Sequence, residues 1–598
     1  MSKLRIAVID RDKCTNTKCG YICHNVCPVE RMNTDCVVVP EKKDEKTNPN
    51  YPFPVILEDP CTACGLCVKK CPVDCIKIIN LAREAGTLMH QYGVNTFRLY
   101  NLPLPRQGVV GLIGSNGTGK TTALKILSGA FIPNMGDFKN KATWEFVISK
   151  FENSPDLRNY FTQMKNAKLS YKPQNVDRLS EVVKGKVKDL LKKSDQRKVL
   201  DEVIESFDLG EVVDRDIKNL SGGELQRVAI SAAYMKDADV YFFDEPSSYL
   251  DIDQRLRVAR AFKKLGEQKK IIVVEHDLAV LDYSSDFVQV FYGTPGAYGV
   301  VSAVKGVRSG INEFLDGYLK DENVRFRQNE LKFTTESSGA GERKGATKYS
   351  YPEMKKTWKD FKLEISSGSM KAGEVIGIVG RNAIGKTSFM KLIAGADEPD
   401  KGSDKPEKKF KVSYKPQYIQ ADFSGTVQEL FDSEKLVNNV LNECMNRLAV
   451  RDLLLNQVKN LSGGELQRVA ITLALSRDAD VYLFDEPSAF LDVEQRLHFS
   501  HLLRSVIENS EKCAFVIDHD IVLVDSVSSR LIVFDGKSSV HGESSSPQEK
   551  REGMNSFLAQ MNVTLRRDRD TKRPRVNKLD SKMDREQKEA GEYYYYEK

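Results

Sequence analysis

The stretch LSGGELQRVAI, at residues 220–230, occurs a second time at residues 461–471 without a single change. A second run, DADVYFFDEPSSYLD, ends at Asp251 and returns as DADVYLFDEPSAFLD, which ends at Asp492. Both pairs are separated by the same 241 residues. Shared motifs in one order and at one spacing indicate an internal duplication, so we expect two copies of one domain.

Each copy also has a glycine-rich loop directly after an apolar run that is typical of a buried strand. The first loop reads GSNGTGKTT (residues 114–122) and the second reads GRNAIGKTS (residues 380–388). The backbone N–H groups of such a loop bind phosphate, its lysine contacts the β- and γ-phosphates, and the next hydroxyl contacts Mg²⁺. The sequence therefore predicts two ATP sites. Their loop residues are Gly114, Asn116, Gly117, Gly119, Lys120, Thr121 and Thr122 in the first copy and Gly380, Asn382, Gly385, Lys386, Thr387 and Ser388 in the second.

The two loops differ at one informative position, where the first has Gly117 and the second has Ala383. If this position requires a positive φ, alanine there costs about 1 kcal/mol of backbone strain. We therefore expect the two sites to bind or hydrolyse ATP differently.

An apolar strand that ends in two acids follows in each copy. The first acid would bind Mg²⁺, and the second would polarise the attacking water. A glutamine from YKPQ would help to position both, and a histidine would contact the γ-phosphate. Positioning and charge neutralisation supply most of the rate in phosphoryl transfer, so this set predicts ATP hydrolysis. The residues are Asp244, Glu245, Gln174 and His276 in the first copy and Asp485, Glu486, Gln417 and His519 in the second.

The repeated LSGGELQR motif resembles the signature of ABC-type ATPases. In that family two modules face each other head to tail, and the signature of each module completes the ATP site of the other. The resemblance implies that Ser221 and Gly223 join the site of Lys386, that Ser462 and Gly464 join the site of Lys120, and that Asp251 and Asp492 link the two sites.

Aromatic residues ahead of each loop are candidates for stacking on adenine. They are Tyr92 or Phe97 in the first copy and Tyr351 in the second. Packing in the hydrophobic core is an equal alternative for each of them.

The N-terminal region is rich in cysteine, since ten of the twelve cysteines precede residue 76. The run CTACGLCVKKCP (residues 61–72) has the spacing of a bacterial ferredoxin, and CTNTKCGYICHNVCP (residues 14–28) also closes in Cys-Pro. We therefore expect two [4Fe–4S] clusters, with a zinc ribbon as the alternative. In two-cluster ferredoxins the fourth cysteine binds the other cluster. The expected ligand sets are Cys61, Cys64, Cys67 and Cys27, and Cys14, Cys19, Cys23 and Cys71, with Cys36 and Cys75 left over.

Composition narrows the class of protein. The chain has 598 residues and a net charge of only +6, so any polyanion-binding surface must be local. It has no apolar run of membrane-spanning length and no signal-peptide core at its start. We therefore expect a cytoplasmic protein, with the nucleus as a second location.

The first copy has about 23 more residues between its loop and YKPQ than the second. Apolar residues at helical spacing on both sides of NSPD predict a helix–turn–helix insert at about residues 138–168, whose large side chains favour a docking surface. Each copy is followed by a related connector that contains a G-[IM]-N-x-F-L core, and basic residues follow both connectors.

These features together resemble the ribosome-recycling ABC ATPase family (ABC subfamily E, RNase L inhibitor) over nearly the whole chain. The resemblance implies an ATPase that splits post-termination or stalled ribosomes with a release factor or its rescue paralogue. It implies that the protein stays on the small subunit until ATP is hydrolysed, that it also serves translation initiation with initiation factors, and that its hairpin and basic connectors contact ribosomal RNA or pack at a hinge.

The expected fold is a multidomain α/β protein, with a ferredoxin-like α+β domain ahead of two head-to-tail ABC modules. Its boundaries are 1–80 for the cluster domain, 81–305 for the first module, 306–345 for a hinge and linker, 346–545 for the second module, and 546–598 for a basic hinge and tail. A transporter ATPase subunit, an ATP-driven electron donor, a DNA-repair ABC ATPase and a cluster-free translational ABC factor are the competing classes. The N-terminal cysteines argue against a transporter subunit and against a cluster-free translational factor. The short gaps between loop and signature argue against a DNA-repair ATPase. An electron donor would change the oxidation state of its cluster during ATP turnover.

Overall fold

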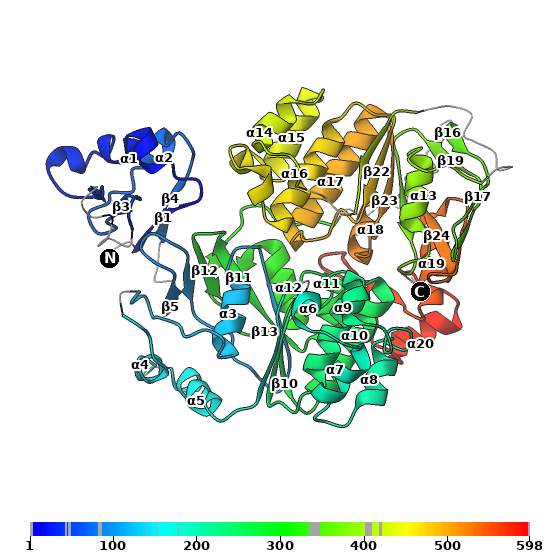
Figure 1. Cartoon of the computed structure of the whole chain (residues 1–598), viewed down its shortest axis with the longest axis horizontal. Helices are drawn as coiled ribbons and strands as arrows, with labels where there is room; N and C mark the ends of the chain where they lie inside the picture. The colour runs from blue at the N-terminus through cyan, green and yellow to red at the C-terminus, as the bar shows by residue number, and fades with distance from the viewer. Residues whose placement is uncertain are drawn as a thin grey trace.

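A computed structural model gives the arrangement of three bodies along the chain (Figure 1). A small cysteine-rich domain at the N-terminus is followed by two larger α/β modules, as predicted. No helix in the described part of the chain is long and apolar enough to cross a membrane. The structure describes residues 4–41, 45, 50–81, 86–138, 140–151, 154–176, 179–333, 347–400, 410–417 and 421–595.

The cysteine-rich domain has very little core of its own. Strands β1 (Leu4–Ile9) and β4 (Ile76–Leu81) form an antiparallel pair. The short helices α1 (Ile22–Asn25) and α2 (Leu66–Lys70) lie beside them. The hairpin of β2 (Val37–Val38) and β3 (Val55–Ile56) completes it. Six of its buried core side chains are cysteines, so its packing depends on what those thiols bind.

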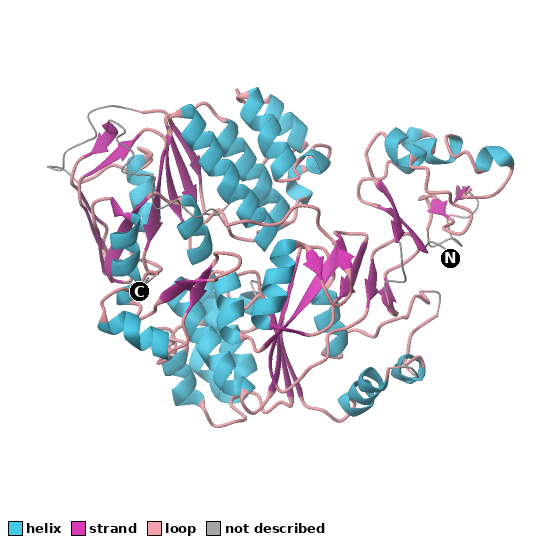
Figure 2. Cartoon of the chain, turned by 180° about the vertical axis from the view of Figure 1, so that it is seen from behind, coloured by secondary structure: helices cyan, strands magenta, loops and turns pink. Residues whose placement is uncertain are grey.

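The sheet of the first module has a parallel half that carries the repeated motifs. The strands β8 (Leu169–Lys172), β9 (Val240–Asp244) and β10 (Lys270–Val274) are parallel. Strand β7 (Gly108–Gly114) pairs in parallel with β11 (Phe287–Thr294), and β10 lies next to β7, where the Glu275 N–H donates to the Leu112 carbonyl at 3.3 Å. An edge of β12 (Tyr298–Val301), β6 (Arg98–Tyr100) and β5 (Leu88–Gln91) faces the cysteine-rich domain (Figure 2). The covering helices are α3 (Lys120–Leu127), α7 (Val187–Ser194), α8 (Leu200–Ser206), α9 (Gly222–Tyr234), α10 (Ile252–Gly266) and α11 (Leu278–Ser284).

The second module repeats this order. Its parallel strands run β21 (Val412–Lys415), β22 (Val481–Asp485), β23 (Cys513–Ile517), β20 (Glu374–Val379) and β24 (Arg530–Lys537). The edge strands are β25 (His541–Ser544), β18 (Lys362–Ile365) and β17 (Met354–Thr357), and its helices are α13 (Lys386–Ile393), α14 (Val427–Asp432), α15 (Asn438–Arg447), α16 (Gly463–Ser476), α17 (Val493–Ser510) and α18 (Ile521–Val527).

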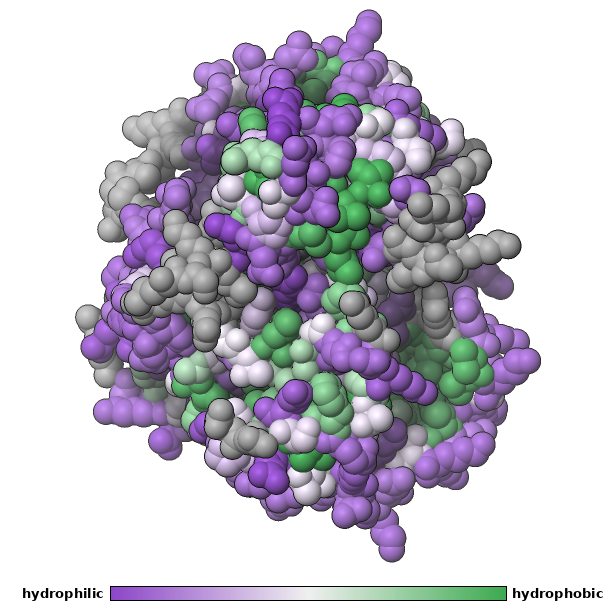
Figure 3. Space-filling model, turned by 90° about the vertical axis from the view of Figure 1, so that its left-hand side faces the viewer, coloured by the Kyte–Doolittle hydropathy of each residue, from purple (hydrophilic) through white to green (hydrophobic). Residues whose placement is uncertain are grey.

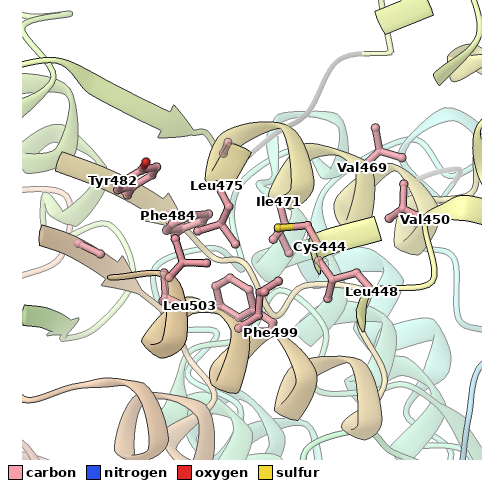
Figure 4. Packing of buried hydrophobic residues seen from close by; sticks show 14 of the residues in the cluster. Cys444, Leu448, Val450, Val469, Ile471, Leu475, Tyr482, Phe484, Phe499 and Leu503 are labelled. Carbon is pink, nitrogen blue, oxygen red and sulfur yellow. The ribbon is translucent and has the colours of Figure 1, made fainter. Parts of the chain in front are cut away.

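The core of the second module lies between helices α15, α16 and α17 and the strand β22 (Figure 4). Phe484 from the strand and Phe499 from α17 meet edge to face, with ring centroids 5.5 Å apart. Cys444 from α15 is fully buried beside them. The strand is apolar on both faces because helices cover both, which explains why its sequence shows no alternation.

The predicted helix–turn–helix insert is confirmed as α4 (Trp144–Ser149) and α5 (Pro155–Met164). Its apolar side chains point into the module rather than outward. Phe161 is fully buried and stacks on Trp144 and Phe151, with centroids 5.4 and 5.6 Å away, and the Tyr160 hydroxyl donates to the Leu127 carbonyl at 2.6 Å. The prediction of a docking surface built from these side chains is therefore not supported, because the rings belong to the core that the hairpin shares with the first module.

The connectors cross between the modules instead of extending into solvent. Helix α12 (Val307–Asp316) follows the first module and α19 (Lys550–Gln560) the second. Beyond α19, β27 (Leu565–Arg567), β28 (Pro574–Val576) and α20 (Lys582–Glu589) lead toward the C-terminus.

The basic segment after α19 packs at this hinge. Arg573 is fully buried, and its guanidinium lies 3.1 Å from the Asp282 carboxylate of the first module. Arg575 lies 2.6 Å from the same carboxylate, and Arg308 of α12 is paired with Asp568 at 3.0 Å. Of the two expectations for this segment, hinge packing accounts for Arg573, whose burial keeps it from contacting RNA. The predicted flexible linker, residues 334–345, lies outside the described residues.

Candidate functional site

The parallel topology brings the predicted hydrolytic residues to one edge of each sheet. In the second module Ile378 of β20, Ile517 of β23 and Asp485 of β22 are register neighbours. The first module has the same arrangement, with Val274 opposite Asp244. Because parallel strands share a carboxyl edge, the loop, the acids and the histidine of one module meet there.

Each loop holds its lysine over the loop backbone. The Lys120 ammonium donates to the carbonyls of Gly114 and Ser115 at 2.8 and 2.9 Å, and Lys386 makes the equivalent bonds to Gly380 and Arg381. Burial lowers the pKa of both lysines, although nearby carboxylates partly oppose this shift. The ammonium groups are therefore desolvated and positioned for phosphate oxygens.

The loop backbone explains where glycine is needed. Gly119 and Gly385 cap the following helices in the left-handed conformation, with φ values of 93° and 103°. The Gly117 position also has positive φ, 76°, and Ala383 takes φ 57° in the second loop. The second loop therefore carries the backbone strain predicted from the sequence, of about 1 kcal/mol.

The second acid of each pair sits in a small polar set. The Gln174 amide donates to Glu245 at 2.8 Å, and the His276 ring nitrogen Nε2 lies 3.4 Å from the same oxygen. Burial alone would raise the pKa of Glu245, but the hydrogen bond and charge of His276, together with Lys120, lower it overall. The second module repeats the set with Gln417 to Glu486 at 2.7 Å and His519 to Glu486 at 3.4 Å. An ionised carboxylate at this place can accept a proton from water.

The first acid of each pair has free ligand oxygens. Both carboxylate oxygens of Asp244 and Oδ1 of Asp485 are buried without a hydrogen-bond partner in the described part of the chain. Burial, and next the neighbouring glutamate, raises the pKa of both aspartates to about 6. Buried carboxylate oxygens with so few donors, beside the Thr121 and Thr387 hydroxyls, fit a hard cation such as Mg²⁺, which accepts oxygen ligands.

The two modules contact each other through these same motifs. The Asn116 N–H of the first loop donates to Asp492 of the second module at 2.9 Å, and the Asn382 N–H donates to Asp251 at 2.9 Å. Asp492 and Asp251 also cap helices α17 and α10. The predicted coupling residues thus bond directly to the loop that holds the opposite nucleotide.

The signature motifs begin helices at this interface. Ser221 and Ser462 cap α9 and α16 with complete capping boxes. A Cβ placed on Gly464 would lie 3.9 Å from the Asn116 amide and 2.9 Å from the Phe490 carbonyl, and one on Gly223 would lie 2.8 Å from the Tyr249 carbonyl. Glycine is needed at these positions because a Cβ would press on a carbonyl of the same module, and the Asn116 amide of the opposite module lies at ordinary contact distance from Gly464.

A cavity of about 210 Å³ lies between the modules. Predicted hydrolytic residues of both modules line it, namely Glu245 and His276 from the first and Gln417, Glu486 and His519 from the second. Tyr249 and Phe490 meet in this cavity with ring centroids 5.8 Å apart. The two hydrolytic sets therefore face a shared space rather than separate surfaces.

The aromatic residues that were candidates for stacking on adenine occupy different environments. Tyr92 is 55% exposed and its hydroxyl lies 3.0 Å from Thr122 Oγ1, while the Phe97 ring packs on Gly119. Tyr351 is only 2% exposed and lies against Phe389. Adenine stacking by Tyr351 is therefore not supported, because the ring belongs to the core.

Phe361 is the residue that the sequence reasoning missed. A Cβ on Gly385 would lie 3.2 Å from its ring, which is the relation that Phe97 has to Gly119. Trp358 lies beside it, with ring centroids 6.0 Å apart. The shared pattern of phenylalanine, a basic residue and leucine at Phe97 and Phe361 was the available signal.

Four cysteines of one predicted set line a common cavity, and a further thiol lies beside members of each predicted set. A cavity in the N-terminal domain is lined by Cys14, Cys19, Cys23, Cys71 and also Cys75. The other predicted set, Cys27, Cys61, Cys64 and Cys67, includes two thiols that neighbour Cys36. No group of three or more histidine, cysteine, aspartate or glutamate side chains in the described residues is arranged to hold a single metal ion. A cavity lined by several thiols fits a multi-iron cluster.

Comparisons with known protein families agree with this geometry. The ABC transporter family matches residues 97–248 and 363–489, and the 4Fe-4S binding domain matches residues 54–77. The cysteine-rich domain is thus an iron–sulfur domain, and the two modules are ABC ATPase domains.

Similar proteins cover the whole chain. An uncharacterized ABC transporter ATP-binding protein of Methanocaldococcus jannaschii is 50% identical over 99% of this chain and 98% of its own length. Translation initiation factor RLI1 of Saccharomyces cerevisiae is 44% identical over 99% of this chain and 98% of its own length. In the solved structure of ribosome-bound archaeal Pelota and ABCE1, a chain with 51% identity aligns over 100% of both chains with a TM-score of 0.91. These full-length matches show that the chain belongs to the ABC ATPase family of ABCE1, RLI1 and the RNase L inhibitor (ABC subfamily E).

Proposed function

We propose that this protein is an ATP-driven ribosome recycling factor, which splits post-termination or stalled ribosomes into subunits. The observation that carries the proposal is the placement of the iron–sulfur domain. It is fixed to the first module by the Arg98–Glu58 ion pair at 2.8 Å and by apolar packing of Ile6 and Val8 against Tyr100. It also reaches the second module, where the Lys13 ammonium donates to the Asp452 carbonyl at 2.6 Å. A rigid body placed across two closing modules would be displaced when they close.

The ATP cycle would work through the residues at the shared interface. Closure would bring each signature serine and glycine against the nucleotide held by the opposite loop, and Asp251 and Asp492 would report the state of one loop to the other module. Glu245 and Glu486 would accept the proton of the attacking water while Gln174 and Gln417 orient it. Bound Mg²⁺ would neutralise phosphate charge. It would be held by Thr121, Gln174 and Asp244 in one site and by Thr387, Gln417 and Asp485 in the other.

Two [4Fe–4S] clusters would stabilise the fold of the moving domain. A core in which cysteines make up much of the buried surface cannot be rigid without ligation. We assign one cluster to Cys14, Cys19, Cys23 and Cys71 and the other to Cys27, Cys61, Cys64 and Cys67, which are the sets that the two thiol groups support.

The domain's surface suits contact with another body. Met32 is 78% exposed, and Val38, Leu57 and Leu66 are also exposed on the same small domain. The side of the molecule that carries this domain and the hairpin is mostly hydrophilic with apolar patches between (Figure 3).

The partners that we propose follow the relatives. The ribosome, chiefly the small subunit with its RNA, would be the main partner, with a release factor or a Pelota-like rescue factor as the second. Initiation factors would be further partners, since the yeast relative is named a translation initiation factor. We place the protein in the cytoplasm, with the nucleus as an additional location, and keep the proposed domain boundaries of 1–80, 81–305, 306–345, 346–545 and 546–598.

Sedimentation of purified ribosomes tests this proposal. With ATP, release factor and the wild-type protein, we expect separated subunits, and with ADP we expect intact ribosomes. The Glu245→Gln and Glu486→Gln double variant should stay bound to the small subunit after ATP is added. If ribosomal subunits remain joined in the complete reaction, the proposed recycling function is refuted. Oxidation of the iron–sulfur clusters during ATP turnover would instead favour the alternative function, that of an ATP-driven electron donor.

A further inference from the structure

The thiol-lined cavity of the N-terminal domain contains one cysteine more than a [4Fe–4S] cluster uses as ligands. Cys14, Cys19, Cys23, Cys71 and Cys75 all line it. Cys75 is 4% exposed, whereas Cys71 is half-buried. A cubane cluster takes one thiolate on each of its four irons, so one of these five thiols is surplus.

Cys75 lies beside both Cys14 and Cys71, and Cys71 is the thiol that shares a tight turn with it, so Cys71 and Cys75 are the pair that would compete for one iron. Their sulfur atoms lie 3.5 Å apart, and the Cys75 N–H points at the Cys71 sulfur over the same distance. Sulfur atoms this close cannot bind two different corners of a cluster, but either can bind the same corner after a small shift of its side chain.

The backbone holds both thiols at this corner. Cys71 ends helix α2, and the Asp74 N–H turns back to the Cys71 carbonyl at 3.5 Å, with Asp74 itself in the left-handed conformation. Cys75 directly precedes β4, and its carbonyl accepts a hydrogen bond from the Asp10 N–H at 2.8 Å. The tight turn between a helix end and a paired strand therefore presents two thiols to one point.

We propose that Cys71 and Cys75 are alternative ligands of one iron of this cluster, so that Cys75 replaces Cys71 when Cys71 is lost. This inference rests on the proposed assignment of two clusters. In the exchange the Cys71 sulfur leaves the iron and takes up a proton, and the Cys75 thiol gives up a proton as it binds. No electron is transferred, and no further reactant is needed.

Iron and acid-labile sulfide in the anaerobically purified full-length protein test the proposal, together with electron paramagnetic resonance after dithionite reduction. Wild type should contain about eight irons per chain. Cys71→Ala and Cys75→Ala should each keep about eight irons and two reduced-cluster signals, with the signal of one cluster altered in Cys71→Ala. The Cys71→Ala, Cys75→Ala double variant should fall to about four irons, and its remaining cluster signal shows that the domain still folds.

Cys19→Ala is the matched control, because Cys19 lines the same cavity and its thiol donates to the Asn16 carbonyl at 3.1 Å rather than to a second thiol. It should lose iron as the double variant does. The proposal is overturned if Cys71→Ala loses as much iron as the double variant, or retains only a three-iron cluster. A wild-type protein with about four irons would instead refute the assignment of two clusters.

Discussion

Replacement of Asp492 can separate two roles of one side chain. Its Oδ2 accepts the Asn116 N–H of the opposite loop at 2.9 Å, and its Oδ1 accepts the Gln495 N–H at 3.0 Å at the start of α17. Asparagine caps helices about as well as aspartate. Asp492→Asn can therefore keep the cap through its remaining oxygen, while its amide NH₂ faces the Asn116 N–H and removes the contact between the modules.

The expected magnitude follows from these two bonds. A hydrogen bond to a charged group contributes about 1.5–3 kcal/mol, so its loss should weaken the contact between the two modules by about 10- to 150-fold. Asp492→Ala should cost about 1 kcal/mol more, because it also removes the helix cap. Asp251→Asn is the matched control, since Asp251 makes the same pair of bonds to Asn382 and Gln254 at the other site.

Energy transfer between dyes on the two modules, titrated with a non-hydrolysable ATP analogue, measures closure. Asp492→Asn should require a higher analogue concentration to occupy and close the Lys120 site, and Asp251→Asn should do so for the Lys386 site. If Asp492→Asn closes like wild type and only Asp492→Ala is impaired, the side chain acts as a helix cap and the coupling argument is wrong.

Three further outcomes follow from the site and the hinge. Burial raises the pKa of Asp244 to about 6, from an ordinary value of 3.8, so its protonated form competes with Mg²⁺. Apparent Mg²⁺ affinity should fall up to about tenfold per unit as pH drops below this value, and a flat calorimetric profile between pH 5 and 8 would contradict it. Asp282→Asn leaves the Arg573 guanidinium buried without its carboxylate, at a cost of about 3–5 kcal/mol, so hydrogen exchange should rise across residues 562–595. Phe361→Ala should raise the KM for ATP with little effect on folding, whereas Tyr351→Phe should leave KM unchanged; equal effects would refute the distinction between them.

The hydrolytic set could be predicted almost completely from the sequence. Each of its members follows a strand of the parallel sheet, and parallel strands share a carboxyl edge, so the order of motifs along the chain determines which side chains meet. Glu245, Gln174 and His276 come together for this reason. The helix–turn–helix insert was predictable too, because its amphipathic period is local.

Tertiary structure alone decided the features that depend on pairing between distant segments. Tyr351 and Phe361 are both aromatic residues ahead of the same loop, and only the sheet register buries the first and brings the second to Gly385. Arg573 reads as part of a solvated basic tail, yet the crossing of the C-terminal connector onto α11 buries it against Asp282.

The sequence by itself determined the two ABC modules, their loops and acids, and the number and spacing of the cysteines, since each rests on a local pattern repeated in order. Local patterns did not reveal that Cys75 joins the cavity of Cys14, Cys19, Cys23 and Cys71, and the pairing of loops with opposite signatures came only from the resemblance to a known family. Those depend on contacts such as Asn116 to Asp492, 376 residues apart in the chain, and Cys71 to Cys75, whose meeting requires a turn between a helix end and a paired strand. Local patterns fix which groups are available, while folding of the whole chain fixes which of them lie within bonding distance.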